Sequence, residues 1–501
     1  MKRIIQALTL TLLAVIIGAS ARPVQKSTRP VRGRHFYVAP EGRPNHPGTL
    51  NRPLDITTAL SARTPARPGD TIWLRGGVHA APQAILFGTE EPTLVSTLTG
   101  SATAPIIVRQ YPGERAIVNG GIRIEGAWTW YRDFEISNSS PQRHHKRPMG
   151  LHVFGPHTKF INLVIHDNGN GIGFWQAAEN AEIYGAIIYH NGWEETNDYR
   201  GHGHGIYAQN LSGAKLISDV ISFNNYSSGM KAYSEQGHAN QITFEGNISF
   251  NNGAPARPQT AYNRVENLLV GTSINPVEGV RLIANHTYHP PDSTGNSIFI
   301  GYAAASNRDV VISNNYFVGG DTNHTYLTRW EQIVFTGNTL IGGRDLLVLQ
   351  MPAGLNSVAY QQWDDNHYLS RHNPSPFIYT DSKVSGYRSL DEWQRITGLD
   401  RRSAWLANRQ GRPTRNHILL RPNRYDRQRA NLAIYNWEHL ENVEVDLHEF
   451  LKAGDRFVIR NVQDYFGPPV VTATFNGQPI RVPMTGTPTS PEFNAFVIFR
   501  N

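Results

Sequence analysis

A repeated pattern of short β-strands constrains the fold of this chain more than any other feature of its sequence. The repeated segments are 160–169, 181–192, 214–225 and 240–253, with weaker copies at 310–319 and 332–342. Each contains two short alternating apolar and polar runs, a polar residue at the bend, and Asn-Gly or Asn-Asn at its end. A third short run follows several of them, at 171–175, 205–209 and 229–233. Three strands repeated with a period in the twenties are typical of one solenoid turn.

The repeat predicts an all-β fold in which the turns stack. One copy alone cannot bury its apolar face, whereas stacked copies share a continuous core. Equivalent asparagines, such as Asn191 and Asn225, are then placed to form a hydrogen-bonded ladder between turns, which explains them without a catalytic role. A propeller blade would need four strands and roughly 40 residues, so it fits the pattern less well.

The sequence resembles the right-handed parallel β-helix proteins of the pectate lyase superfamily. Motifs that match the usual entry to that fold lie at 35–42, 47–49, 68–77, 104–109 and 111–113. The resemblance covers residues 35–375 and implies a right-handed parallel β-helix. It does not identify one chemistry, because the superfamily includes lyases, hydrolases, epimerases and adhesins.

The first residues have the pattern of a cleavable secretion signal. Basic residues at 2–3 precede an apolar run at 7–17 that is short for a membrane span, and a small-x-small motif lies at 19–21. We therefore expect a signal peptide at 1–21, a basic linker at 22–34, and a secreted or periplasmic protein of bacterial type with no membrane span. The lack of cysteine excludes disulfides, thiolate metal sites and a cysteine nucleophile.

The chain after the repeats contains a helix, a connector and a second β domain. We expect the β-helix to occupy 35–400 and to end near a short capped helix between Ser389 and Gly398. An Arg-rich connector at 401–430 leads to a small antiparallel β-sandwich at 431–501, in which apolar and polar residues alternate. Similar domains accompany secreted carbohydrate-active enzymes, and we expect this one to cover the end of the coil or to stiffen the chain.

The charge balance favours an acidic partner. Lys and Arg total 47 against 40 Asp and Glu, a net charge of +7, which suits polyanions or simply aids solubility. A secretion signal and the scarcity of lysine-rich tracts argue against nucleic acid. We expect a monomer that acts on an acidic, uronate-containing polysaccharide.

The resemblance implies a ligand groove along the face formed by the third strand of each turn. Side chains alternate along a strand, so an inward column of Leu151, Ile172, Ile206 and Met230 leaves two outward columns. These contain His152, Gly173, Tyr207 and Lys231, and then Phe154, Trp175, Gln209 and Tyr233. Aromatic rings suit sugars and cations suit carboxylates, although a solvated sheet face with incidental aromatics is the alternative. The expected substrate-binding residues are His152, Trp175, Gln209, Tyr233, Trp193 and Arg143.

Two loops place further polar residues near this face. The longest insertion, at 192–204, contains His202 and His204, whose i, i+2 spacing directs both side chains to one side of an extended strand. A basic loop at 143–147 precedes the strand of His152. The two histidines suit acid–base chemistry, substrate positioning or a metal pair, and the alternative is a turn whose histidines bond to the backbone.

β-Elimination from a uronic acid polymer suits this set of residues. The reaction needs a base for the proton alpha to the carboxylate, a cation for the developing charge, and a donor for the leaving oxygen. The catalytic candidates are Lys231 or His204 as base, Arg200 or a bound cation as stabiliser, and Tyr207 as donor, with His202 beside them.

Calcium is an open option as a cofactor. Several similar β-helix lyases use a Lys or Arg base with calcium bridging the substrate carboxylate. Here Asp167, Asp198 and Asp219 are scattered and form no tight cluster, and Asp219 is expected at a bend. The metal ligands therefore stay unassigned.

Two other function classes remain open. Glycoside hydrolysis needs two carboxyls about 5 to 9.5 Å apart, which Glu194, Glu195, Asp198 and Glu235 can supply from loops. Gly-His-Gly at 201–203 is similar to an element of β-helix polygalacturonases, but their paired aspartates and Arg-Ile-Lys element are absent. A glycan-binding surface protein or adhesin would have the same fold, and the concentration of His, Arg, Lys and Tyr in adjacent turns argues against it.

Overall fold

The structure is a computed structural model that describes residues 33–195, 198–255, 265–302, 306–321, 323–352, 354, 358, 360–381, 383 and 385–501, without the side chains of 195, 198–200 and 323–324. The expected signal peptide at 1–21 lies outside the described residues, as does all of the linker at 22–34 except its last two residues. Residues Gly33–Asn501 form one compact unit. No helix in the described part of the chain is long and apolar enough to cross a membrane.

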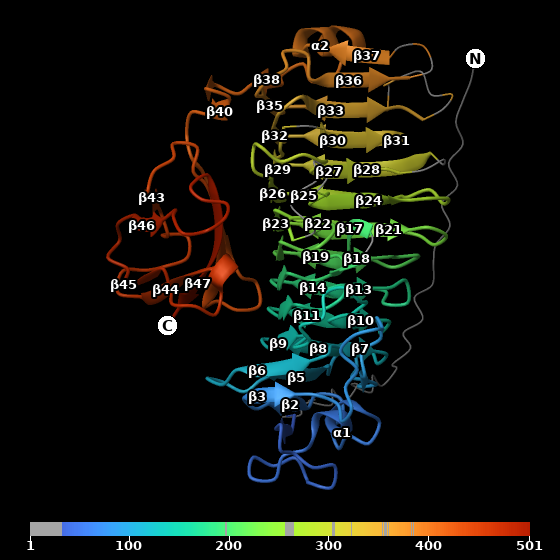
Figure 1. Ribbon diagram of the computed structural model, residues 1–501, viewed down its shortest axis with the longest axis vertical. Coiled ribbons are helices and arrows are strands. Elements are labelled where there is room, and N and C mark those ends of the chain that lie inside the picture. The colour runs from blue at the N-terminus through green and yellow to red at the C-terminus, as the bar shows by residue number, and fades with distance from the viewer. Residues whose placement is uncertain are drawn as a thin grey trace, which may run out of the picture. The chain divides into compact units, whose positions relative to one another are not determined.

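The chain winds into a parallel β-helix with three long sheets of twelve strands each (Figure 1). Sheet 1 contains β1 (His35–Val38), β2 (Thr71–Leu74), β5 (Ile106–Gln110), β8 (Thr129–Arg132), β11 (Lys159–Ile161), β14 (Glu182–Tyr184), β19 (Lys215–Ser218), β22 (Ile242–Glu245), β25 (Val280–Ile283), β28 (Asn307–Ser313), β31 (Trp330–Thr336) and β34 (Gln362–Asp364).

Sheet 2 takes the second strand of each turn. It contains β3 (Gly77–His79), β6 (Ala116–Asn119), β9 (Glu135–Ser137), β12 (Val164–His166), β15 (Ile187–Tyr189), β20 (Ile221–Phe223), β23 (Ile248–Phe250), β26 (His286–Tyr288), β29 (Tyr316–Val318), β32 (Thr339–Gly342), β35 (His367–Ser370) and β38 (Ala404–Trp405).

Sheet 3 takes the third strand of each turn and ends with β37 (Ser385–Arg388), which pairs antiparallel with β36 (Phe377–Thr380). It contains β4 (Leu94–Ser96), β7 (Ile122–Ile124), β10 (Leu151–Val153), β13 (Ile172–Phe174), β18 (Ile206–Ala208), β21 (Met230–Ser234), β24 (Leu268–Thr272), β27 (Ile298–Ile300), β30 (Asn323–Thr328), β33 (Asp345–Gln350), β36 and β37. The predicted solenoid of three-stranded turns is confirmed.

The bend between sheets 1 and 2 repeats the same backbone conformation from turn to turn. Asn162, Gly185, Asp219 and Gly246 have φ angles of 54°, 62°, 53° and 63°. Asn, Asp and Gly adopt this left-handed region most readily, which explains the polar or glycine residue at each bend. Asp219 is the bend residue that the sequence predicted.

The asparagine ladder is also confirmed. Side-chain Nδ2 groups donate to the Oδ1 of the next turn at 3.3, 3.1, 2.9 and 2.9 Å along the series Asn168, Asn191, Asn225, Asn252 and Asn267. A second ladder joins Asn247, Asn285, Asn315, Asn338 and Asn366 at 2.9 to 3.1 Å. These buried amides pair with one another, so the core tolerates their polarity.

Helix α2 (Leu390–Thr397) closes the C-terminal end of the coil, whereas α1 (Ile56–Leu60) lies near its start. Ser389 and Glu392 form a capping box at the start of α2. Trp393 is fully buried against Trp363 and Phe377, with ring centroids 5.6 and 5.7 Å away, and its Nε1 donates to Asp400 at 2.8 Å.

The C-terminal part forms two antiparallel sheets, which we call the sandwich. Its five-stranded antiparallel sheet has the order β41 (His417–Pro422), β42 (Arg429–Tyr435), β47 (Phe493–Arg500), β44 (Arg456–Asn461) and β45 (Val471–Thr474). A two-stranded sheet of β43 (Asn442–Val445) and β46 (Ile480–Pro483) covers one face, and η1 (Val462–Asp464) follows β44. A small hairpin of β39 (Asn408–Arg409) and β40 (Arg412–Pro413) precedes it.

Two details of the sandwich differ from the sequence-based expectation. Strand β41 lies inside 401–430, which we expected to be a connector, because its arginine and proline residues obscure the alternation. The sandwich also packs along sheet 2 instead of covering the end of the coil. Leu432 and Ile434 of β42 face the sandwich interior, whereas Ala433 and Tyr435 pack against the β-helix, so both faces of this strand are buried.

Candidate functional site

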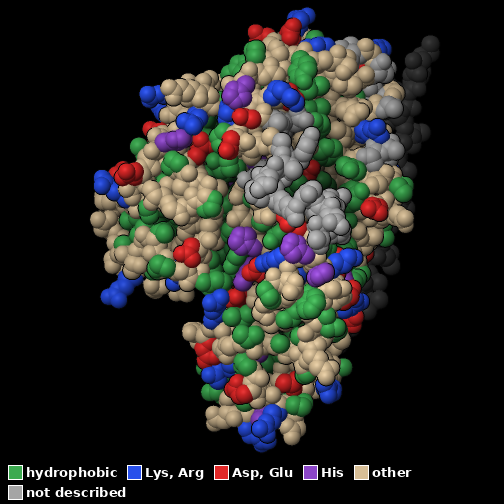
Figure 2. Space-filling model, in the orientation of Figure 1, with side chains coloured by type: hydrophobic (Ala, Val, Ile, Leu, Met, Phe, Trp, Pro, Cys, Tyr) green, Lys and Arg blue, Asp and Glu red, His purple; other side chains and the backbone are tan. Residues whose placement is uncertain are grey.

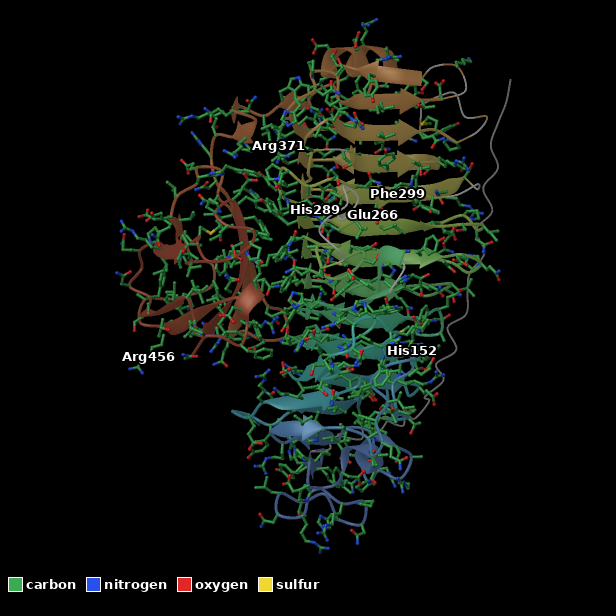
Figure 3. The ribbon with its side chains drawn as sticks, in the orientation of Figure 1. His152, Glu266, His289, Phe299, Arg371 and Arg456 are labelled. Carbon is green, nitrogen blue, oxygen red and sulfur yellow. The ribbon has the colours of Figure 1, made fainter. Side chains whose placement is uncertain are left out.

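The register of sheet 3 sets the geometry of the proposed groove. Leu151, Ile172, Ile206 and Met230 pair in series and are all fully buried. The neighbouring outward positions therefore stack in the predicted order His152, Gly173, Tyr207, Lys231, and this series continues to Leu269 and Phe299. Figure 3 shows His152 and Phe299 on sheet 3 with several turns between them.

A pocket of about 410 Å³ opens beside this column. It is lined by Glu90, Lys146, Met149, Asn170, Trp175, Trp193, His202, Gly203, His204, Tyr207 and Gln209. Six of these are sequence-predicted site residues: Trp175, Trp193, His202, His204, Tyr207 and Gln209. The structure thus brings the 192–204 insertion and the outward columns of sheet 3 to one cavity. Figure 2 shows histidine, lysine and arginine side chains gathered on the face over the middle turns.

His204 has a defined tautomer. The backbone N–H of Ser228 donates to His204 Nδ1 at 3.1 Å, so the neutral ring has its proton on Nε2. The ring stacks on Tyr207 with centroids 5.5 Å apart. In this state His204 is a hydrogen-bond donor, which does not suit the role of base that was one of our two assignments.

The insertion forms a short antiparallel hairpin of β16 (Trp193–Glu195) and β17 (Asp198–His202). Trp193 pairs with His202 across it, and their rings stack with centroids 5.4 Å apart. Trp193 is only 4% exposed. The two rings form one wall of the pocket. The Arg200 side chain lies outside the described residues, so its assigned role stays a prediction.

Tyr207 and Lys231 lie side by side on the groove face. The Lys231 Nζ is 5.6 Å from the Tyr207 ring centroid and 4.4 Å from that of Tyr233, distances at which a cation interacts with an aromatic ring. Burial raises the pKa of Tyr207 to about 12. Its hydroxyl therefore stays protonated and can donate to a substrate oxygen at neutral pH.

Three of the predicted binding residues, His152, Arg143 and Tyr233, lie outside the pocket lining and have protein partners. The Tyr233 hydroxyl forms a hydrogen bond with that of Ser273. His152 is 6% exposed, its Nδ1 is 2.9 Å from Glu91 Oε2, and burial lowers its pKa. Arg143 pairs with Asp167. It also donates to two backbone carbonyls where the 192–204 insertion begins, at 3.1 Å to His190 and 3.3 Å to Gly192. Arg143 thus anchors the insertion.

The sequence reasoning missed several residues near the pocket. Glu90 and Asn170 gave no signal, and Lys146 was noticed only as part of a basic loop. Lys215 was also missed: it is 1% exposed, and its Nζ donates to the carbonyls of Phe174 at 3.2 Å, Gln209 at 2.6 Å and Trp175. Lys215 therefore holds the ends of the two strands that place Trp175 and Gln209.

The described residues do not fit a calcium site. Within the described ranges no three His, Cys, Asp or Glu side chains gather closely enough to hold a metal ion. Asp167 pairs with Arg143 and His166, and Asp219 pairs with Arg421. Among the described pocket residues, Glu90 is the only carboxylate.

Comparisons with known proteins agree with this architecture. Residues 36–174 match the family model described as "Pel9A-like, right handed beta helix region". The chain is 27% identical over 230 residues to a pectate disaccharide-lyase of Dickeya chrysanthemi, covering 40% of this chain and 28% of that protein. It is 35% identical over 86 residues to the pectate lyase PEL9 of Emericella nidulans, covering 17% of this chain and 18% of that protein.

A solved structure is also among the similar proteins. The crystal structure of pectate lyase Pel9A aligns with a TM-score of 0.42 and 17% identity, over 70% of this chain and 78% of that one. The chain matches only between 18% and 28% of the length of the two curated relatives named above. The expected resemblance to the right-handed β-helix proteins of the pectate lyase superfamily is confirmed.

Proposed function

We propose that this chain, a β-helix protein whose residues 36–174 match the Pel9A-like region, is a secreted lyase that cleaves a uronate-containing polysaccharide by β-elimination. The observation that supports this most is the composition of the sheet 3 pocket. It combines Tyr207, His204 and Lys146 with aromatic walls, beside Lys231, and contains one described carboxylate. Hydrolysis needs a pair of carboxylates, and the described lining residues contain only Glu90.

The proposed reaction divides the work among three groups. Lys146 binds the carboxylate of a uronate and withdraws charge from the carbon alpha to it. Lys231, in its neutral form, removes the proton from that carbon, and the C–H electron pair becomes the new C=C bond. The C–O bond to the neighbouring sugar breaks, and Tyr207 gives its proton to the leaving oxygen.

The neighbouring side chains position the substrate in this scheme. The Nε2–H of His204 donates to a sugar oxygen, because Ser228 holds its Nδ1. Trp175 and Trp193 supply flat apolar surfaces for sugar rings. Arg200 in the same insertion remains a candidate second cation. No step requires a metal ion.

The test is ultraviolet absorbance with a panel of polyuronates, because elimination creates an unsaturated ring that absorbs. Lys231→Ala and Tyr207→Phe should each lower turnover by about 10²- to 10⁴-fold, the usual contribution of a positioned acid or base. Lys452→Ala, which removes an exposed lysine of the sandwich, is the matched control and should leave turnover unchanged. Added chelator should have no effect.

Three results would contradict the proposal. Full activity in a folded Lys231→Ala variant would show that Lys231 is not the base. Reducing ends without absorbance would indicate a hydrolase that uses loop carboxylates. Retardation by a polyuronate gel without any cleavage would indicate a glycan-binding protein.

A further inference from the structure

A second cavity lies where the sandwich meets the β-helix. This junction pocket has a volume of about 470 Å³, within the usual range of about 300–1,000 Å³ for ligand sites. Its described lining comes from sheets 1 and 2, the bends between them, and the sandwich, so it is separate from the sheet 3 pocket. The lining residues that matter here are Arg109, Arg115, Arg132, Asp133, Arg429 and Phe466. Figure 2 shows basic and acidic side chains interleaved where the sandwich meets the lower turns.

Arg429 is a buried cation that lacks an ion-pair partner. Its side chain is 3% exposed, one Nη donates to the Gly185 carbonyl at 2.9 Å, and its Nε has no hydrogen-bond partner. No carboxylate pairs with it among the residues that the structure describes. A buried charge without a counter-charge is unfavourable, so an anion in the pocket would be stabilised there.

Arg109 and Arg132 add to the positive charge. Both bond to the same oxygen of Asp133, at 2.9 and 2.8 Å, so one carboxylate serves two guanidiniums. The Nε of Arg109 is buried without a partner, and burial lowers the pKa of Arg109 despite Asp133. Across the whole lining, four arginines face three carboxylates, which leaves one positive charge in surplus.

Phe466 gives the pocket a flat apolar wall. It is 41% exposed, and the Arg115 guanidinium lies 3.6 Å from its ring centroid while bonding to Glu135 at 2.7 Å. An exposed ring beside surplus guanidinium charge suits a sugar that bears a carboxylate, because the ring packs on the sugar and the guanidinium binds the carboxylate.

We propose that the junction pocket is a second, non-catalytic binding site for a uronate residue of the polysaccharide. This inference rests on the proposed function for the identity of the polymer. The site would hold a distant part of the chain while sheet 3 carries out the reaction. Two linked binding sites increase the effective affinity for a long polymer, and a short oligomer gains nothing from the second site.

The experiment is calorimetric titration of the full chain carrying Lys231→Ala, in which turnover is lower by about 10²- to 10⁴-fold, with tetragalacturonate and tetraguluronate in parallel. One of them should bind at two sites per chain. Adding Arg429→Met should weaken one site by about 10- to 100-fold, the usual effect of losing a charged hydrogen-bonding group. Phe466→Ala should weaken the same site, and it serves as the second variant if Arg429→Met does not fold. Arg481→Met, an exposed arginine of the sandwich, is the matched control.

The same variants are then made with Lys231 intact. Arg429→Met should raise the KM for a long polyuronate and leave the cleavage of a short oligomer unchanged. A single binding site that neither variant weakens would overturn the inference. If wild type still produces unsaturated sugar, the proposed function would stand without the junction site. Two binding sites without any cleavage by wild type would contradict the proposed lyase activity and support the junction site. Equal binding of inorganic phosphate, or of a carboxyl-reduced tetramer, would show that the pocket does not recognise a uronate.

Discussion

His286 and His417 form a pair between the β-helix and the sandwich that should make their association sensitive to acid. His286 lies on β26 and His417 on β41, with their Nε2 atoms 3.1 Å apart and their ring centroids 5.3 Å apart. Tyr316 stacks on His417, with centroids 3.9 Å apart, and also lies near His286, at 5.9 Å. At this distance one ring must donate and the other accept, so both rings cannot be protonated without repulsion.

Burial lowers the pKa of His286 to about 3 and that of His417 to about 4, with the neighbouring ring adding to the shift of His286. The ordinary value is about 6.5. Below that pH the unfolded chain binds protons that the folded chain does not, so the free energy of unfolding falls as the pH drops from about 6.5 to about 4. Each histidine contributes a slope of about 1.4 kcal/mol per pH unit, or about 2.7 for the pair. Above pH 6.5 this contribution is fully present.

His417→Phe isolates one half of this effect. The phenyl ring keeps the stack on Tyr316, but it leaves His286 Nε2 without its partner, which costs about 1–3 kcal/mol at neutral pH. Urea unfolding at a series of pH values, followed by tryptophan fluorescence, gives the free energy of unfolding of both proteins. The destabilisation caused by the substitution should shrink by about 1.4 kcal/mol for each pH unit below 6.

The matched control is His144→Phe, which removes an exposed histidine away from this pair and should leave the acid profile of wild type unchanged. Parallel profiles for wild type and His417→Phe between neutral pH and about 4.5 would refute the reasoning, since they would mean that His417 binds protons equally in both states.

Three further predictions concern the interior of the β-helix. Lys215→Met should lower the free energy of unfolding by about 1–3 kcal/mol in urea titration, because the Gln209 carbonyl loses its donor, and it should raise the KM for polymer as Trp175 and Gln209 shift; an unchanged KM would contradict this. Asn225→Ala interrupts a buried ladder and should cost about 2–4 kcal/mol by the same measurement, whereas Asn408→Ala, at an exposed position, should cost nothing. Trp393→Ala should cost about 3–5 kcal/mol in thermal or urea unfolding, and a smaller loss would show that α2 is not essential to the cap.

The repeat made most of the β-helix predictable. The alternation around Leu151, Ile172, Ile206 and Met230 fixed both the register and the outward columns, because a shift by one residue would turn every apolar side chain to the solvent. The asparagines gave the ladder for the same reason: their amides are satisfied only by equivalent residues in adjacent turns. Local rules repeated many times thus determine the long-range pairing.

The site was predictable only in part. Trp175, Tyr207 and Gln209 belong to the repeat, so their relative positions followed from it. Glu90 and Lys146 come from loops whose path depends on tertiary packing, and no local rule places them. Arginine is a common residue in sites that bind acidic ligands, but in this fold Arg143 pairs with Asp167 and donates to two backbone carbonyls.

Burial that depends on distant partners was also difficult to predict from the sequence. Lys215 shares the inward face of β19 with Ile217, where a charged side chain is unexpected, and three carbonyls at the strand ends accept from it. Strand β42 was misjudged because its second face is buried against another domain. Neither partner is visible in the local sequence.

The lateral position of the sandwich has a consequence for how the β-helix unfolds. In an isolated solenoid each turn contacts only its neighbours, so turns at the end can peel away one by one and local openings spread like a zipper. Here the sandwich packs on sheet 2 from Val164 on β12 to Leu369 on β35. Opening any turn in this range requires partial release of a body that also holds distant turns. The turns that contact the sandwich should therefore melt together as one unit, while the first turns, before Arg115, fray independently.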